Sequence, residues 1–260
     1  MFYDLSLLTT VLLFLAIFFA GFVDAVAGGG GLIQQPSLLI SFPQTDTVTV
    51  MGTSKTAAAF GTSAAALKYR KSIKTDPRLL LAMVIPAYIG SSIGALLATH
   101  ISAQNLKTSI FAMMVAIFFY TWRRPELGKL HIEKHSPEKL KKIGAIAALV
   151  IGFYDGLIGP GTGTLLMIVL VAVMGFAFVG ASAIAKVVNL VTNIAAIVVI
   201  GMRVPVMWKL GVALGLANLV GGYIGSHYAI KRGSGFVRTF YLIVTALLIF
   251  RLGVDIASHW

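Results

Sequence analysis

Four ionisable side chains lie deep inside apolar segments of this sequence, and they form two pairs with the same spacing. Asp24 and Asp155 are 131 residues apart, and so are Lys55 and Lys186. An isolated charge at the centre of a bilayer costs about 2.5–3.5 kcal/mol on insertion scales. Such side chains must therefore face the interior of the protein, where they can bind a charged solute, transfer a proton or pair with one another.

A glycine-rich stretch follows each aspartate within a few residues. The first stretch is Gly28 to Gly31, and the second is Gly159 to Gly163, which contains Pro160. Four consecutive glycines cannot form a good helix, and irregular backbone at membrane depth is tolerated only against protein or water. The freed N–H groups, together with the start of the following helix, would attract an anion. The alternative is close packing of helices through small residues. We assign that packing role to a second set of glycines: Gly90, Gly94, Gly221 and Gly225.

Small polar residues accompany the two lysines. Asn189 and Asn193 follow Lys186 at helical spacing, which places all three on one helix face. Thr53 and Ser54 directly precede the other lysine. Helix interfaces in lipid also use such residues to hold helices together. The sequence therefore predicts these substrate-binding residues: Lys55, Lys186, Gly29, Gly30, Gly161, Thr162, Asn189, Asn193, Thr53 and Ser54.

The charges in the apolar segments allow two interpretations. In the first, the lysines draw an anion to the middle of the membrane, while Asp24 and Asp155 serve in proton coupling or gating. In the second, each aspartate pairs with a lysine and only ties helices together, although buried ion pairs stabilise poorly compared with apolar packing. The first interpretation requires the ammonium groups to reach a shared, hydrated pocket.

The composition places these residues in a membrane protein. Of 260 residues, 58% are hydrophobic and only 12% are charged. No soluble core could bury this much apolar sequence, so the lipid bilayer is the expected surrounding. The net charge of +12 lies in connecting loops. It therefore indicates orientation in a membrane rather than binding to nucleic acid.

Several kinds of chemistry are not expected. The chain has no cysteine, which excludes disulfides and thiolate-bound metals. His131 and His135 are four residues apart, but no third ligand accompanies them, so we interpret their segment as a solvated connector without a metal. There is no HExxH and no GxSxG motif. We therefore expect neither an enzyme nor a cofactor.

The apolar segments themselves occur twice. They lie at about 5–27, 47–67, 79–99 and 106–122, with copies at 143–158, 180–201, 209–229 and 236–256. Each half also contains a shorter piece. The piece at 31–42 holds Pro36, and the piece at 162–178 is unbroken and long enough to cross. We expect both to cross, giving five crossings in each half and about ten in total. Eight is the alternative if both pieces are re-entrant.

The segments divide the chain into a first transmembrane repeat at 1–122, a charged linker at 123–142 and a second repeat at 143–260. The loop at 68–78 and the linker are rich in Lys and Arg, so both are expected to be cytoplasmic. An odd number of crossings per half would invert the second repeat. The predicted fold is therefore an all-α polytopic membrane protein with two inverted repeats, discontinuous helices and about 8–10 membrane segments.

The pattern of Asp24, the following glycines and Pro36, the segment of Lys55, and the copies at Asp155 and Lys186 resembles the TauE/SafE family of membrane permeases. The resemblance covers nearly the whole chain. It implies a multi-pass carrier in the bacterial inner membrane for small, often sulfur-containing anions, such as sulfite and organosulfonates.

The second copy departs from the first within the motif. Pro160 stands where the first copy has Gly29, and Thr162 stands where it has Gly31. The two half-sites therefore need not bind the same chemical group.

From the residues and the resemblance together we expect a secondary transporter, an exporter or permease, of a small anionic substrate. Coupling to the proton gradient is a hypothesis, since no ATP-binding loop is present to power transport. An anion channel and a carrier of small carboxylates remain as alternatives. Whether the protein works as a monomer or a homodimer stays open.

Overall fold

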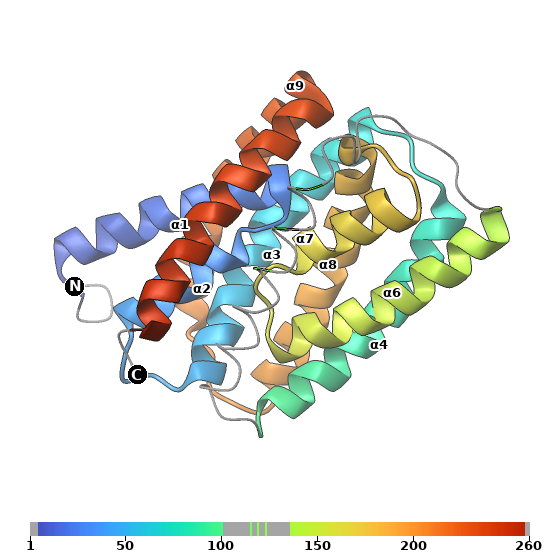
Figure 1. Ribbon diagram of the computed structural model, residues 1–260. Helices are drawn as coiled ribbons and strands as arrows, with labels where there is room; N and C mark the ends of the chain where they lie inside the picture. Colours follow the sequence, from blue (N-terminus) through green and yellow to red (C-terminus); the bar gives the residue numbers. More distant parts are fainter. Residues whose placement is uncertain (1–4, 101–114, 116–118, 120–122, 124–135, 258–260) are drawn as a thin grey trace.

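The computed structural model describes residues 5–100, 115, 119, 123 and 136–257 (Figure 1). The described part is helical throughout, without strands. Its elements are α1 (Leu7–Ala27), α2 (Gly31–Ser41), α3 (Thr47–Ser72), α4 (Pro77–Ala98), α6 (Pro137–Leu157), α7 (Thr162–Ile168), the π-helix η2 (Val169–Val173), α8 (Phe178–Gly201) and α9 (Trp208–Ala257). The predicted segment at 106–122 and the pair His131 and His135 lie outside the described residues, apart from positions 115 and 119.

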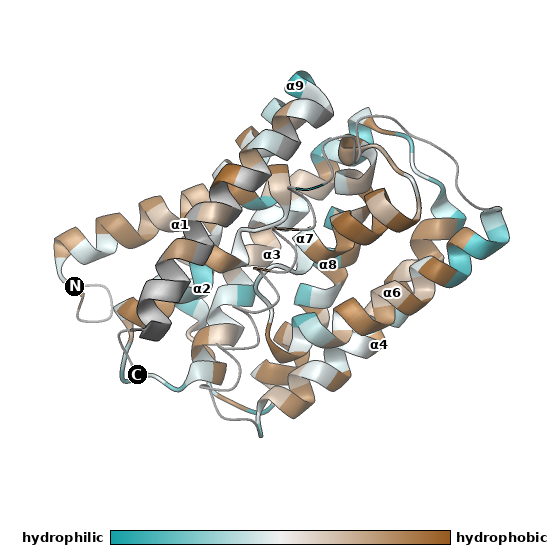
Figure 2. Cartoon of the chain, in the orientation of Figure 1, coloured by the Kyte–Doolittle hydropathy of each residue, from teal (hydrophilic) through white to brown (hydrophobic). Residues whose placement is uncertain are grey.

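Three described helices, α1, α4 and α8, are long and apolar enough to cross a membrane. Large apolar side chains cover the outside of the bundle, with Leu8, Leu81 and Ile146 each more than half exposed. In Figure 2 the outer helices α1, α4 and α6 are mostly hydrophobic, while hydrophilic residues lie on α2, α3 and α8 near the centre. This inside-out distribution is that of a protein whose solvent is lipid.

The helices fall into two parallel sets. In the first set, α1, α3 and the first part of α9 run in the same direction, because later residues of one helix contact later residues of the other. Between α9 and α1, Gly221 contacts Phe18 and Gly225 contacts Phe22. Between α9 and α3, Gly211 contacts Thr56 and Gly222 contacts Gly61. The second set contains α4, α6 and α8. For α4 and α6, Gly90 contacts Leu149 and Gly94 contacts Phe153. For α4 and α8, Met83 shares an apolar cluster with Ala181, and the later Ala98 shares another with the later Ile200.

The two sets run antiparallel to each other. Gly52, near the start of α3, lies against Ile200 at the end of α8. Tyr69, near the end of α3, belongs to the same apolar cluster as Ala181 near the start of α8. The central helices α3 and α8 therefore cross the bundle side by side in opposite directions.

Each glycine stretch reverses the chain inside the protein. Because α1 and α3 are parallel, α2 must return the chain from the end of α1 to the start of α3. Its contacts agree, since Gln34 bonds Ser54 and the later Leu38 packs with the earlier Val50. By the same logic, α7 and η2 return the chain from the end of α6 to the start of α8. The described bundle thus contains two helical hairpins, α1–α2 and α6–α7–η2.

The tips of these hairpins meet backbone to backbone. A Cβ placed on Gly163 would lie 2.7 Å from the Cα of Gly28, and the hydroxyl of Thr164 donates to the carbonyl of Ala27 at 3.1 Å. Gly28 has φ 79° and Gly159 has φ 94°, a left-handed conformation in which a Cβ is strained. Glycine is therefore needed at the tips for both the turn and the close approach.

Two expectations about the segments need correction. The piece at 162–178 does not continue unbroken, because its helical part ends at Val173 and Gly175 turns the chain with φ 90°. At 1.5 Å per residue, α7 and η2 span about 18 Å, well short of a hydrocarbon core of about 30 Å. The piece at 31–42 likewise returns as α2. Because the glycine turns reverse the chain direction, each piece returns toward the end of the bundle where the preceding helix starts, and it forms a hairpin with that helix instead of a further crossing.

The last two predicted segments, 209–229 and 236–256, join in the structure as α9. The helix is interrupted only at Gly233, whose φ 75° and ψ −172° are not helical. The packing assigned to Gly90, Gly94, Gly221 and Gly225 is confirmed, since an added Cβ at each would overlap the backbone of the neighbouring helix.

The close contact at Gly90 predicts the effect of adding one methyl group. Gly90→Ala would place a Cβ against the carbonyl oxygen of Leu149, so we expect the unfolding free energy to fall by about 1–3 kcal/mol. Gly235→Ala is the matched control, because a Cβ at that helical glycine has nothing within 4 Å. Thermal unfolding of the purified proteins in detergent measures both. Equal melting temperatures for the two variants would contradict the packing role.

Candidate functional site

Two ion pairs join the two halves of the chain. The ammonium of Lys55 on α3 lies 2.8 Å from Oδ2 of Asp155 on α6. The ammonium of Lys186 on α8 lies 2.8 Å from Oδ2 of Asp24 on α1. Each lysine follows one hairpin in the chain and binds the aspartate of the other. The four charges identified in the sequence are thus brought together, and the pairing of the second interpretation is present.

The aspartates occupy positions that favour such partners. Asp24 and Asp155 lie in the last turn of α1 and α6, one turn before the glycine tips. A negative charge near a helix C-terminus opposes the helix dipole. Because each carboxylate is unfavourable there by itself, a nearby ammonium is needed to hold it in the low-dielectric interior.

The two pairs differ in their surroundings. The side chain of Lys186 is 0% exposed, while that of Asp24 is 14% exposed. In the other pair both side chains are largely buried, with 6% exposure for Lys55 and 3% for Asp155. Oδ1 of Asp155 also lies 2.6 Å from the hydroxyl of Thr162. The equivalent position near Asp24 is a glycine, so among the described residues the Asp24 carboxylate has, besides Lys186, only a long 3.4 Å contact from Thr62.

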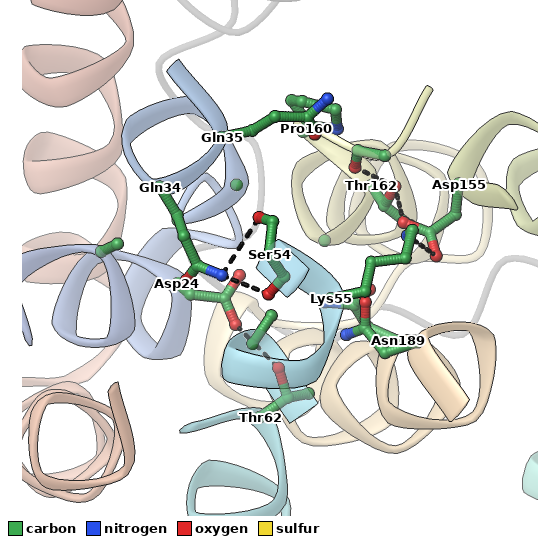
Figure 3. A pocket seen from close by; sticks show the side chains of 18 of the residues that line it. Asp24, Gln34, Gln35, Ser54, Lys55, Thr62, Asp155, Pro160, Thr162 and Asn189 are labelled. Carbon is green, nitrogen blue, oxygen red and sulfur yellow. Dashed lines mark hydrogen bonds and ion pairs between the residues drawn. The ribbon is translucent and has the colours of Figure 1, made fainter. Parts of the chain in front are cut away.

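A small, partly open cavity lies between the hairpin tips. Side chains from α1, α2, α3, α6, α7 and α8 converge on it (Figure 3). Its charged lining residues are Asp24, Lys55 and Asp155, and its carboxamide lining residues are Gln34, Gln35, Asn189, Asn193 and Asn218. The site is therefore polar, with both signs of charge and many hydrogen-bond donors.

Two of the carboxamides are fixed by the protein. The side-chain NH₂ of Asn218 donates to Oε1 of Gln34 at 2.7 Å and to the carbonyl of Ile17 at 3.1 Å. The NH₂ of Gln34 in turn donates to the hydroxyl of Ser54 at 3.1 Å and to its carbonyl. This chain of bonds joins α9, α2 and α3 and holds one wall of the cavity rigid.

Other carboxamides have donors without a protein partner. Gln35 and Asn193 are 6% and 4% exposed, and their side chains make no hydrogen bond within the described part of the chain. Asn189 accepts a 3.4 Å bond from Thr192, but its NH₂ has no acceptor among the described residues. A buried polar group left unpaired costs about 1–3 kcal/mol. These donors are therefore placed to bind a polar molecule in the cavity.

The start of α2 also faces the cavity. Gly30 and Gly31 line it, and no side chain caps the N–H groups of the first turn. The N–H groups of Leu32 and Ile33 donate to the carbonyls of Gly29 and Gly30, so the feature that faces the cavity is the positive end of the helix dipole at Gly30 and Gly31. Since the two ion pairs are neutral in sum, this helix end and the free amide donors make the cavity suited to an anion.

Most of the predicted site residues line this cavity: Gly30, Ser54, Lys55, Gly161, Thr162, Asn189 and Asn193, with Asp24 and Asp155. Lys186, Thr53 and Gly29 do not. Lys186 is fully buried, and its partner Asp24 lies between its ammonium group and the cavity. Thr53 instead donates to the carbonyl of Thr49 and accepts the N–H of Met207, which holds the start of α9 against α3. No group of three or more potential metal ligands occurs among the described residues.

The predicted set omitted three lining carboxamides. Gln34 and Gln35 directly follow the first glycine stretch, and Asn218 interrupts the apolar segment at 210–220. A polar side chain inside an apolar span was the available signal, since such residues face the protein interior. The prediction relied on full charges and on repetition, and Asn218 has no polar counterpart 131 residues earlier, where Ala87 stands.

The chain is similar to known proteins over almost its entire length. The family model described as Sulfite exporter TauE/SafE matches residues 13–252. A probable membrane transporter protein, ORF9, from Sinorhizobium sp is 34% identical over 97% of this chain and 95% of its own length. The probable membrane transporter protein YfcA of Escherichia coli is 30% identical over 97% of this chain and 91% of its own. A probable membrane transporter protein of Haemophilus influenzae is 29% identical over 97% of both. No solved structure matches the chain.

The buried pair of Lys186 and Asp24 predicts a strong coupling between two substitutions. Lys186→Met leaves a carboxylate without its partner, and we expect a loss of about 3–5 kcal/mol of stability. Adding Asp24→Asn removes the orphaned charge and should restore most of that loss. Thermal unfolding of the single and double variants measures the coupling, with the exposed Lys209→Met as control. Additive effects of the two substitutions would show that the pair is not formed.

Proposed function

The chain belongs to the TauE/SafE family of membrane transporters, and from that premise we propose that it is a secondary carrier of a small oxyanion, either sulfite or an organosulfonate. It resides in the cell inner membrane and crosses it several times. The cavity between the hairpin tips is its substrate site.

The observation that carries this proposal is the set of unpaired buried donors. Gln35 from α2 and Asn193 from α8 approach the cavity from different helices, and Lys55 of α3 lines the same cavity. A sulfite or sulfonate group presents three acceptor oxygens in a tripod, which donors on separate walls can bind together. A carboxylate has two oxygens in one plane and would leave a donor unpaired, which disfavours it.

We further propose that the two halves are inverted repeats. Three helix starts support this, because they recur after 131 residues: Gly31 and Thr162, Thr47 and Phe178, and Pro77 and Trp208. The helices so related run in opposite directions, so that the two hairpins enter from opposite ends of the bundle. Binding sites between inverted repeats with broken helices are typical of secondary transporters, which expose the site to each side in turn.

The distribution of basic residues supports an orientation. The end of α3, the start of α4 and the start of α6 lie at the same end of the bundle, and they carry Lys68, Arg70, Lys71, Lys74, Arg78, Lys139, Lys141 and Lys142. Positively charged loops stay on the cytoplasmic side. The hairpin of α6 and α7 therefore enters from the cytoplasm, and the hairpin of α1 and α2 enters from outside.

Binding by the free amides is testable by substitution. We expect Gln35→Leu and Asn193→Leu each to weaken anion binding about tenfold or more, since a hydrogen bond to a charged group contributes about 1.5–3 kcal/mol. Gln44→Leu is the matched control, because that amide is exposed outside the cavity. The measurement is ligand-induced thermal stabilisation of purified protein by sulfite, methanesulfonate, sulfoacetate, sulfate and acetate.

The panel separates the substrate classes. Stabilisation by the sulfur oxyanions that both cavity variants lose and Gln44→Leu keeps would support the assigned site. Stabilisation by acetate alone would favour a carboxylate carrier. No stabilisation by any of these anions would overturn the proposed substrate class.

A carrier and an anion channel differ in counterflow. We expect proteoliposomes preloaded with unlabelled substrate to accumulate labelled substrate transiently, and the uptake rate to saturate with concentration, because one site alternates between the two sides. Flux that rises linearly with concentration and shows no counterflow would indicate a channel instead.

A further inference from the structure

Within the described part of the chain, one ammonium group is open to the cavity between the hairpin tips. Lys55 lines that cavity, whereas Lys186 is fully buried and absent from its wall. Asp24, which does line the cavity, bonds the buried ammonium at 2.8 Å. A bound anion can therefore form a direct charge contact with Lys55 and not with the second lysine.

The accessible ammonium is already occupied by a carboxylate. Nζ of Lys55 donates to Oδ2 of Asp155 at 2.8 Å, and no other hydrogen bond from this ammonium occurs among the described residues. The carboxylate of Asp155 also lines the cavity and repels an incoming anion. The internal carboxylate and the substrate thus compete for the same cation.

The structure offers Asp155 a different set of partners from Asp24. The hydroxyl of Thr162, at the start of α7, lies 2.6 Å from Oδ1 of Asp155 and 2.7 Å from the carbonyl oxygen of Gly159. A carboxyl group that leaves Lys55 can stay bonded to this hydroxyl. Asp24 has no such second partner at short distance, and its departure would strand a fully buried ammonium. The pair of Lys55 and Asp155 can open, whereas the pair of Lys186 and Asp24 must stay closed.

From this asymmetry, and resting on the proposed transport function, we infer that Asp155 is the exchangeable counter-ion of the site. When the anion binds, it replaces the carboxylate of Asp155 on the ammonium of Lys55, and Asp155 takes up one proton. Asp24 keeps its charge and its bond to Lys186 throughout.

The exchange balances in charge and atoms. One proton from water joins the Asp155 carboxylate, its contact with the Lys55 ammonium is released, and an oxygen of the anion accepts the freed N–H bond. For a monovalent anion, one negative charge enters as one positive charge enters, so the charge of the cavity is unchanged. The cost of an additional buried charge is thereby avoided. One proton therefore travels with each monovalent anion.

Few other charged or titratable groups act on Asp155. From α3 it faces Lys55, and Asp24 of α1 and Lys186 of α8 form the neighbouring pair. On its own helix, the hydroxyl of Tyr154 is held by the carbonyl of Pro160. Among the described residues of the two further elements near Asp155, Thr162 of α7 donates its hydroxyl to the carboxylate, whereas the hydroxyl of Ser91 on α4 donates to the carbonyl of Thr192. A proton effect on anion binding can therefore be traced to the four charges of the two pairs.

The experiment measures the dissociation constant of methanesulfonate, which stays singly charged, on purified full-length protein between about pH 5 and pH 8. For the wild type we expect binding to weaken by up to about tenfold per pH unit as the pH rises, because one proton is taken up with each anion. Asp155→Asn removes the competing charge, so binding should become independent of pH and at least as tight as the wild type at low pH. The double variant Asp24→Asn/Lys186→Met removes the other pair without leaving a buried charge, and it should keep the wild-type slope.

The outcomes separate this inference from the proposed function. A wild-type slope that is lost in Asp155→Asn and kept in Asp24→Asn/Lys186→Met supports the exchange. A slope that persists in Asp155→Asn overturns it while anion transport stands. Absence of methanesulfonate binding to the wild type at every pH overturns the exchange and counts against the proposed sulfonate substrate as well.

A second variant keeps the test decisive if Asp155→Asn does not fold. Thr162→Val preserves the side-chain shape and removes the hydroxyl that supports the ionised carboxylate. We expect its binding profile to keep the slope and to shift its midpoint to higher pH. A profile identical to that of the wild type would contradict a role of Asp155 in proton uptake. Ser182→Val, a buried hydroxyl on α8 away from the cavity, is the matched control and should leave the midpoint unchanged.

Discussion

The structure depends on the cost of placing charge inside an apolar bundle. Two carboxylates lie at helix C-termini, where the helix dipole opposes them, and two lysines lie in the middle of the central helices α3 and α8. Each charge is acceptable only because a partner from the other half of the chain lies 2.8 Å away. The pairing therefore holds the two hairpin tips at the same depth and creates the polar centre around which the cavity forms.

The glycine tips make that pairing geometrically possible. Side chains at Gly28 or Gly163 would keep the hairpins apart, and the lysines would then not reach across. Where the chain turns, it leaves helix ends and backbone donors facing a small polar cavity. The cavity lining is chemically unequal: Asn218, Gln34 and Ser54 form a bonded network, while Gln35 and Asn193 have no hydrogen-bond partner among the described residues.

Part of this arrangement could be predicted from the sequence, and part could not. The charges were recognisable because ionisable residues are rare in apolar segments, and the segments at 47–67 and 79–99 followed from apolar length. The capping residues Asp46 and Asp76, which fix where α3 and α4 begin, were not used in that prediction. The piece at 162–178 was wrongly expected to cross, because hydropathy records length and not direction. The effect of the φ 90° turn at Gly175 and of the reversal at the glycine tips appears only when neighbouring helices are in place.

The sequence by itself determined that the chain is surrounded by a lipid bilayer, where the four interior charges lie along it, and which family it belongs to. It also determined the glycine stretches that follow Asp24 and Asp155. These properties are local, since each follows from residue type, spacing or similarity along the chain. Only the tertiary structure decided which lysine meets which aspartate, that Lys186 is sealed while Lys55 faces the cavity, and that Asn218 joins the site from α9. Those relations join residues about 100 to 200 positions apart, and they are set by how helices pack and in which direction each one runs.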